Sequence, residues 1–161
     1  MKQFIFLLFL CISLLTPLKS QKITTMSFDE LEPYLHRQSD SLFMIHFWAT
    51  WCVPCVKEMP VIQKVANEHA HLKLSILLVS LDMPNQLETR LIPFIDKYQI
   101  KSNVVLLNDP DFNSWIDKVS TDWGGGIPAT LFYSQKHRNF YEQSFEYEEL
   151  NQIISTNIKE L

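Results

Sequence analysis

Stretches rich in apolar residues alternate along the chain with stretches in which apolar residues recur at helical spacing. Three of the apolar stretches favour strands buried on both faces of a sheet, and the first of them is interrupted only by His46. These strands are predicted at 42–48, 72–81 and 104–107. Two later segments have the composition of a hairpin, at 129–133 and 139–145.

Between and after these strands, the pattern predicts helices. The first begins with a capping box, in which Ser27 is followed three residues later by Glu30, and we expect it to continue to about Gln38. The others are predicted at 56–65, 84–98, 112–119 and 147–159. Strands that alternate with helices indicate an α/β fold, with a central, mostly parallel sheet, an antiparallel hairpin at one edge and helices on both faces.

The first twenty residues have the order of a secretory signal peptide. Lys2 precedes an apolar run from Phe4 to Leu15, and small or polar residues lead to Ser20. The run is shorter than the ~20 apolar residues that a membrane span needs. We therefore predict a signal peptide over 1–20 and one domain over 21–161, with an uncleaved N-terminal membrane anchor as the alternative.

Composition narrows the class of protein further. The chain has 161 residues, of which 47% are hydrophobic and 20% charged, and this balance is typical of one globular domain with a substantial core. The formal net charge is -4, and no basic stripe is present to neutralise phosphates. These features argue against a nucleic-acid binder.

Cysteine usage points to chemistry. Of the three cysteines, Cys11 falls within the predicted signal peptide, while Cys52 and Cys55 stand where the strand 42–48 turns into a helix. A disulfide that closes so short a loop constrains the unfolded chain little, so a structural crosslink is the weaker explanation. A helix N-terminus favours thiolate over thiol. We therefore expect Cys52 to be the nucleophile and Cys55, one turn further, to resolve a mixed disulfide.

The main alternative for this cysteine pair is half of a zinc site. Such a site needs two further ligands at suitable spacing. His69 and His71 are the clustered candidates, but they are separated by a single residue, whereas the usual pattern is H-x₃₋₅-H.

The surroundings of the pair resemble a known family. Phe-Trp-Ala-Thr-Trp-Cys-Val-Pro-Cys at 47–55, with Pro60 in the following helix and Ile-Pro at 127–128, resembles the thioredoxin superfamily. Within it, Cys-Val-Pro-Cys-Val-Lys-Glu-Met-Pro is similar to the exported TlpA/ResA-like thiol-disulfide oxidoreductases. The resemblance covers roughly residues 28–160. It implies a thioredoxin-like fold with a TlpA/ResA-like central insertion, and dithiol–disulfide exchange outside the cytoplasm.

The resemblance also implies roles for residues outside the pair. It implies that the Ile127–Pro128 bond is cis and lies beside the cysteines, with backbone groups of Ile127 pairing with an extended substrate. An ordinary trans proline before an edge strand is the alternative. Glu58, three residues after Cys55, is implicated in the thiol chemistry through a partly buried carboxyl group. A solvated helix carboxylate is the alternative there.

His46 departs from the family pattern, in which an acidic residue or an amide occupies this strand position. Two interpretations stay open: a proton relay beneath Cys55, or a hydrogen-bonded core histidine. Trp51 adjoins Cys52, and Trp123 immediately precedes the glycine run. Both tryptophans are predicted to border the substrate groove.

We therefore predict an extracytoplasmic thiol-disulfide oxidoreductase of the bacterial periplasm that acts as a disulfide reductase. Val53 and Pro54 place no cation between the cysteines to stabilise the thiolate as strong oxidants do. The alternatives are a thiol oxidase of the same fold, and a metal-handling or interaction module that binds copper or zinc through the thiolates. A peroxidase is disfavoured because the loop before Cys52 lacks the Pro-x-x-x-Thr-x-x-Cys pattern.

The partners follow from this chemistry. We expect exported protein disulfides or dithiols as substrates and a membrane or exported protein as redox donor. The protein is expected to act as a monomer and to need no cofactor or metal ion.

Overall fold

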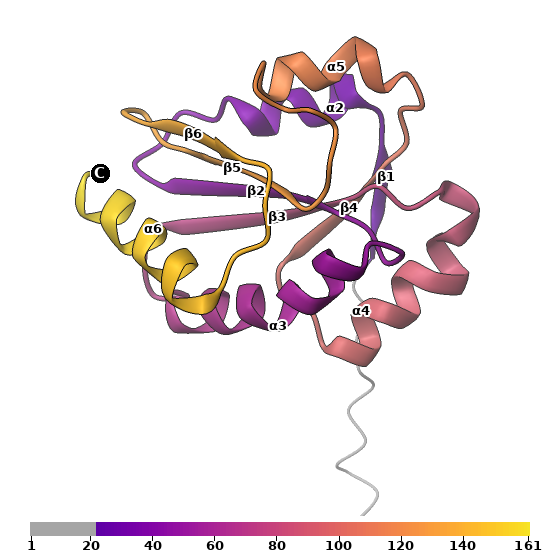
Figure 1. Ribbon diagram of the computed structural model, residues 1–161, viewed down its shortest axis with the longest axis horizontal. Coiled ribbons are helices and arrows are strands. Elements are labelled where there is room, and N and C mark those ends of the chain that lie inside the picture. Colours follow the sequence, from indigo (N-terminus) through magenta and orange to yellow (C-terminus); the bar gives the residue numbers. More distant parts are fainter. Residues whose placement is uncertain (1–21) are drawn as a thin grey trace, which may run out of the picture.

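The computed structural model describes residues 22–161. Its centre is a six-stranded mixed sheet (Figure 1). The strands are β1 (Thr24–Met26), β2 (Leu42–Trp48), β3 (Leu74–Ser80), β4 (Asn103–Leu107), β5 (Ala129–Tyr133) and β6 (Arg138–Tyr141), and their spatial order is β1-β4-β3-β2-β5-β6. The first four pair in parallel, while β5 is antiparallel to both β2 and β6. The predicted α/β class, with a hairpin at one edge, is confirmed.

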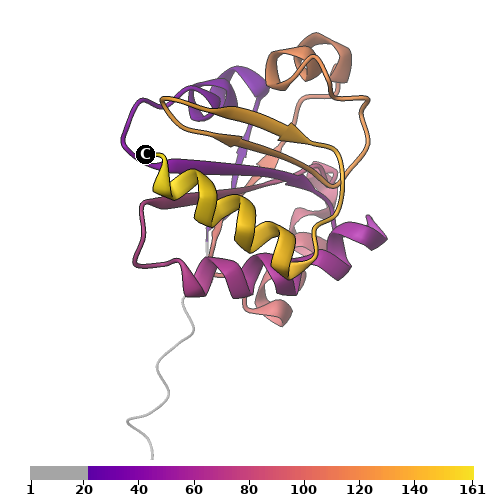
Figure 2. The same cartoon turned by 60° about the vertical axis from the view of Figure 1, so that its left-hand side comes forward.

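Helices cover both faces of this sheet. They are α2 (Phe28–Leu31), which continues as the 3₁₀ turn η1 (Glu32–Leu35), α3 (Val53–Glu68), α4 (Ile92–Tyr98), α5 (Phe112–Val119) and α6 (Tyr147–Lys159). Figure 1 shows α2 and α5 on one face and α3, α4 and α6 on the other. The turned view in Figure 2 shows α6 passing alongside α3. The unit formed by α4 and β4 lies in the middle of the chain, where the resemblance places an insertion.

The central strand β2 explains why its sequence is an almost unbroken apolar run. All seven of its residues are buried, because it has neighbours on both sides and helices on both faces. Met44 and Trp48 pack into the core under α3, α4 and α6. Ile45 and Phe47 pack into the second core, under α2 and α5. Packing on both faces therefore holds β2 and the turn that follows it in place.

Two helices differ from the pattern-based prediction, and a proline accounts for each difference. The capping box at Ser27 and Glu30 is present, but the α-helix changes to 3₁₀ geometry after Leu31, because Pro33 has no N–H to continue the α-helical ladder, and the 3₁₀ turn ends at Leu35, not Gln38. The predicted helix 84–98 consists of the 3₁₀ turn η2 (Pro84–Gln86), the π-turn η3 (Leu87–Leu91) and α4. Pro93 leaves the Thr89 carbonyl without an i+4 donor, which matches the widened turn before it.

Two strands also differ. β1 has only three residues and was not predicted, since its pairing with β4 is non-local. β6 ends at Tyr141 instead of Phe145, because Glu142 turns away from the ladder to bind backbone N–H groups of another loop.

The predicted signal peptide 1–20 lies outside the described residues. Within residues 22–161, no helix has the length and apolar character needed to cross a membrane.

Candidate active site

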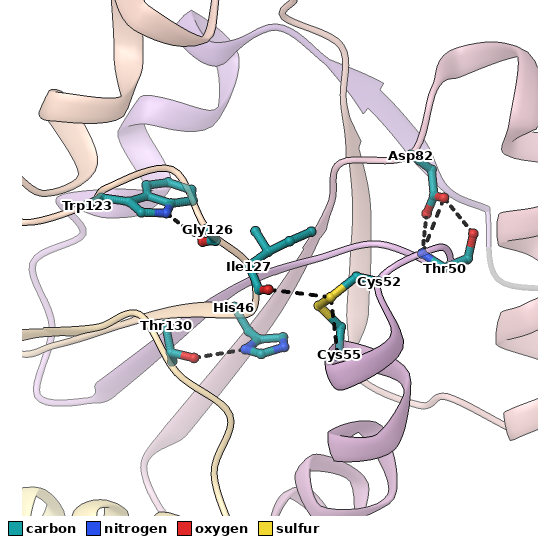
Figure 3. Close-up of a disulfide and its surroundings, with 9 residues drawn as sticks. All are labelled: His46, Thr50, Cys52, Cys55, Asp82, Trp123, Gly126, Ile127 and Thr130. Atoms are coloured by element: carbon teal, nitrogen blue, oxygen red, sulfur yellow. Dashed lines mark hydrogen bonds between the residues drawn. A yellow bond between two sulfur atoms is a disulfide. The ribbon is translucent and has the colours of Figure 1, made fainter.

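A disulfide joins Cys52 and Cys55 at the start of α3, immediately after the turn that follows β2 (Figure 3). Cys52 occupies the N-cap position, and the Cys55 N–H donates a hydrogen bond to its sulfur at 3.3 Å. In the reduced protein the same N–H group and the positive end of the helix dipole favour a thiolate on Cys52. The geometry therefore matches the predicted order of reactivity.

The two sulfur-bearing residues differ in access. Cys52 is 5% exposed, whereas Cys55 is completely buried. A bulky partner can therefore reach only the first cysteine. Val53 beside it is 64% exposed and leaves the approach open on the α3 side.

The second segment of the site is Ile127–Pro128, which lies 75 residues away in sequence. The peptide bond between these two residues is cis, as predicted. The Ile127 carbonyl oxygen is 3.6 Å from Cys52 Sγ (Figure 3). A disulfide sulfur has no proton to donate, so this approach becomes a hydrogen bond only when Cys52 is a thiol. The predicted proximity of Pro128 to the cysteine pair is confirmed, while substrate pairing at Ile127 stays a prediction.

The loop before Ile127 is held from two sides. The Gly124 and Gly126 N–H groups donate to the two carboxylate oxygens of Glu142 at 2.7 and 2.6 Å. From the other side, the Trp123 indole N–H donates to the Gly126 carbonyl at 2.8 Å (Figure 3). A Cβ on Gly126 would lie only 2.5 Å from Glu142 Oε1. Glycine at this position therefore allows the carboxylate to approach the backbone.

The two tryptophans predicted at the substrate groove differ in their exposure to solvent. Trp51 is 53% exposed beside Cys52, as expected. Trp123 is only 4% exposed and packs against Phe47, Trp115 and other aromatic rings of the second core. The prediction that the Trp123 ring borders the substrate groove is wrong, because the ring is buried among other aromatic rings and its N–H holds the loop.

Asp82, which follows a predicted strand and to which the sequence alone assigns no role, belongs to the site. Its buried carboxylate accepts hydrogen bonds from the Thr50 N–H at 3.1 Å and the Thr50 hydroxyl at 2.6 Å (Figure 3). It also accepts one from the Ser80 hydroxyl at 2.8 Å. These bonds attach the turn before Cys52 to the end of β3. The topology could have indicated this contact: β2 and β3 are parallel neighbours, so the residues that follow their carboxyl ends meet at one edge of the sheet.

Glu58 is buried on the same helix as the cysteines. It is 3% exposed, and its Oε1 accepts a hydrogen bond from the Phe145 N–H at 3.0 Å. Its other oxygen has no hydrogen-bond partner among the described residues. Burial raises its pKa from 4.5 to about 7; the charge of Glu149 also raises this pKa, and the bond from Phe145 lowers it. The alternative of a solvated carboxylate is wrong.

His46 lies between Thr130 and the disulfide (Figure 3). It is completely buried, and its Nδ1 is 2.9 Å from the Thr130 hydroxyl on the neighbouring strand β5. Its Nε2 has no hydrogen-bond partner within residues 22–161. Burial lowers the pKa of His46 to about 3, so the ring is neutral at physiological pH.

Some of the exposed apolar side chains stand near the cysteines. Within the described part of the chain, the large hydrophobic residues that are exposed are Trp51, Val53, Met83 and Tyr98. Trp51 and Val53 flank Cys52, and Met83 follows the aspartate that binds Thr50. Tyr98 stands apart from them, at the end of α4.

The histidines considered as zinc ligands lie elsewhere. His69 caps the far end of α3, and its Nε2 is 2.7 Å from Asn151 Oδ1. Among residues 22–161, no cluster of three or more His, Cys, Asp or Glu side chains has an arrangement that could hold a metal ion.

Comparisons with known proteins agree with this geometry. The model of the AhpC/TSA family matches residues 17–138. Thiol-disulfide oxidoreductase ResA of Oceanobacillus iheyensis is 42% identical over 57 residues, which cover 35% of this chain and 28% of that protein. Thioredoxin-like protein YneN of Bacillus subtilis is 33% identical over 63 residues, which cover 39% of this chain and 36% of that protein. The chain thus spans about a third of the length of these curated relatives.

A solved structure shows the same fold. It is a secreted disulfide oxidoreductase of Mycobacterium tuberculosis described as homologous to E. coli DsbE. Its TM-score to this chain is 0.56 at 19% sequence identity, over 73% of this chain and 83% of that one.

Proposed function

We propose that this chain, which belongs to the AhpC/TSA family, is a thiol-disulfide oxidoreductase that reduces disulfides in exported proteins. One observation carries the proposal. Cys52 is the accessible member of a cysteine pair at a helix N-terminus, and an N–H group of that helix already bonds to its sulfur. A thiolate at this position is both stabilised and reachable.

The reaction runs through two exchanges that balance in electrons. In the reduced protein, the Cys52 thiolate attacks a client disulfide, forms a mixed disulfide and releases one client thiolate, which takes up a proton. Cys55 then loses its proton and attacks Cys52 Sγ, which releases the second client thiol. The client gains two electrons, and the pair ends as the disulfide that the structure holds. A membrane or exported dithiol donor must return two electrons before the next cycle.

A client-trapping experiment tests the two cysteine roles. The Cys55→Ser variant should accumulate mixed disulfides with a peptide disulfide on non-reducing gels, while Cys52→Ser should form none. Trapping by Cys52→Ser instead would contradict the assignment of the nucleophile.

The direction of the reaction depends on the reduction potential. No cation stands between the cysteines at Val53 and Pro54, so we expect a potential nearer the approximately −270 mV of thioredoxin than the approximately −120 mV of DsbA. Equilibration of the protein with a glutathione or dithiothreitol series measures it. A value near that of DsbA would favour the alternative, a thiol oxidase.

Two segments contribute to client binding in this proposal. Trp51 supplies exposed apolar area beside Cys52. Backbone groups of Ile127, next to the cis Pro128, face the same sulfur and accept an extended client strand. Trp51→Ala should raise KM for a peptide disulfide while leaving the alkylation rate of Cys52 unchanged. An unchanged KM would remove Trp51 from the binding surface.

Glu58 and His46 serve as acid–base groups. With a pKa of about 7, Glu58 can either give or take a proton at physiological pH. When Nδ1 carries the ring proton and donates it to the Thr130 hydroxyl, His46 Nε2 can accept the proton that Cys55 loses in the second exchange. Because the pKa of His46 is about 3, it holds that proton only briefly. The role proposed for His46 concerns only the second exchange, in which Cys55 resolves the mixed disulfide.

The test separates the two exchanges. His46→Leu should slow resolution of a preformed mixed disulfide by about tenfold and leave alkylation of Cys52 unchanged. This is less than the roughly 10²–10⁴-fold of a well-matched general base, because the pKa of His46 lies far below neutral pH. Thr130→Val retains the imidazole and serves as the milder comparison. If His46→Leu resolves mixed disulfides at the parental rate, His46 is a core residue without a role in proton transfer.

The location follows from the N-terminal sequence. The apolar run 4–15 supports export with cleavage after Ser20, and the exported protein is proposed to act as a monomer in the bacterial periplasm. Cell fractionation, mass spectrometry of the mature N-terminus and gel filtration test this proposal. An intact N-terminus in the membrane fraction would favour the uncleaved anchor.

Peroxidase chemistry is not proposed, although the matched family model includes AhpC in its name. The positions seven and three residues before Cys52 are Ile45 and Ala49, where a peroxiredoxin pattern would have proline and threonine. Ile45 is moreover a buried residue in the middle of β2.

A further inference from the structure

A shallow groove lies next to the turn that precedes Cys52, between the start of α3 and the segment formed by η3 and α4. Thr50 and Val56 border it on the cysteine side. Arg90, Phe94 and Lys97 border it on the opposite side, together with Pro93 and Tyr98. Figure 1 shows α4 on the same face of the sheet as α3. The groove is thus a feature of the surface on the α3 side of the sheet.

The wall made by η3 and α4 is well anchored. Positions 90, 94 and 97 are separated by about one helical turn each, so their side chains share one face of the segment. The Phe94 ring packs against the buried Trp48 at 5.2 Å between centroids and against Tyr98 at 4.3 Å. The cations are thus carried by a rigid element that is fixed to the core.

The charge of the groove is opposite to that of the chain. The chain has a formal net charge of -4, yet the residues that line this groove include two cations and no acid. Glu88 and Asp96, the acidic residues of the same segment, are not among them. Within residues 22–161, the ion pairs are Lys73–Asp40, Lys118–Glu32 and His137–Glu160, so neither Arg90 nor Lys97 is neutralised by an internal carboxylate.

We propose that this groove selects clients by binding an acidic segment of the client polypeptide, within a few residues of its reactive cysteine. Thr50 and Val56, which border the groove, stand two residues before Cys52 and one residue after Cys55, so a client segment that extends from Cys52 toward α4 would enter the groove. Carboxylates of that strand meet Arg90 and Lys97, and its apolar side chains meet Phe94 and Tyr98. The inference rests on the proposed function, because it defines the substrate class of the same site.

The experiment compares two peptide disulfides that differ only in flanking charge, one with two glutamates and one with two lysines near the cysteine. The parent should reduce the acidic peptide with a kcat/KM at least about fivefold higher, the factor that one exposed ion pair of about 1 kcal/mol supplies. Arg90→Glu and Lys97→Glu should each abolish or reverse this preference. Lys159→Glu, the same charge change at the end of α6, should leave it intact.

A second measurement is independent of turnover. Serine analogues of both peptides bind without exchange, and fluorescence anisotropy should show tighter binding of the acidic analogue, weakened by about 0.5 M salt because exposed charges are screened. Equal kcat/KM and equal binding of the two peptides would overturn the groove assignment while leaving the oxidoreductase intact. Preferential binding of the acidic serine analogue, together with no reduction of either peptide disulfide, would support the groove and overturn the proposed function. A preference that survives Arg90→Glu and Lys97→Glu would place acid recognition elsewhere.

Discussion

The buried carboxyl of Glu58 should make the stability of this protein depend on pH in an unusual direction. Burial raises the pKa of Glu58 from 4.5 to about 7. Between these values the native state holds a proton that the unfolded chain has released. The contribution of Glu58 to the free energy of unfolding is therefore fully present below pH 4.5 and is lost as the pH rises toward 7. Most carboxylates in folded proteins do the reverse, because ion pairs and hydrogen bonds lower their pKa.

The size of the effect follows from the two pKa values. Each unit of difference between the pKa of Glu58 in the folded and unfolded states corresponds to about 1.4 kcal/mol. The free energy of unfolding should therefore fall by about 3 kcal/mol as the pH rises from 4.5 to 7 or above. The Glu58→Gln variant keeps an oxygen to accept from the Phe145 N–H but has no charge to bury. Its stability relative to the parent should therefore increase by about 3 kcal/mol over the same range.

Urea unfolding of the oxidised protein at several pH values measures this difference. All other titrating groups are common to both proteins, so the difference isolates Glu58. Glu149→Gln provides a second comparison: the charge of Glu149 raises the pKa of Glu58, so its removal should reduce the loss of stability. A difference between parent and Glu58→Gln that stays flat from pH 4.5 to 8, or that decreases with pH, would refute the reasoning.

Three further outcomes are expected from the site geometry. In single-cysteine variants, Cys52 should be alkylated at least about tenfold faster than Cys55 at pH 7, because it is the accessible sulfur bonded by a helix N–H; equal rates would contradict this order. Asp82→Ala should lower the free energy of unfolding by about 2 kcal/mol, since it leaves the N–H and hydroxyl of Thr50 without their acceptor. Urea titration checks this. The comparison variant is Thr50→Val, which removes the hydroxyl bond alone and should lower the free energy of unfolding by less. Glu142→Ala should speed hydrogen exchange of the amides at 124 and 126, as followed by NMR; unchanged protection would show that the carboxylate does not hold the loop.

Sequence reasoning was most successful where a local signal and the tertiary structure agree. The buried run 42–48 is β2 residue for residue, and the capping box at Ser27 is formed as expected. The cysteine pair lies at the predicted junction of strand and helix. The cis bond at Pro128 was predicted by resemblance to the family, because nothing local distinguishes it from a trans turn proline.

The remaining features depend on contacts between distant segments. Asp82 lies 32 residues from Thr50, and only the parallel pairing of β2 and β3 brings them together. Glu58 looks like an ordinary helix carboxylate until Phe145 covers it. Trp123 was assigned to the groove because it is close in sequence to Pro128, but its ring has a larger set of aromatic neighbours on the opposite face of the sheet. Burial, in each case, is a property of the fold and cannot be read from spacing.

The attachment of Thr50 to Asp82 has a consequence for the cost of changing oxidation state. The bonds to the Thr50 N–H and hydroxyl fix the backbone ahead of Cys52 through the sheet, and α3 fixes the backbone after it. Opening the S–S bond therefore releases side-chain rotations and very little main-chain motion. We expect the oxidised and reduced forms to have nearly the same backbone, so that a client meets a preorganised surface in either state and little entropy is lost on each passage through the catalytic cycle.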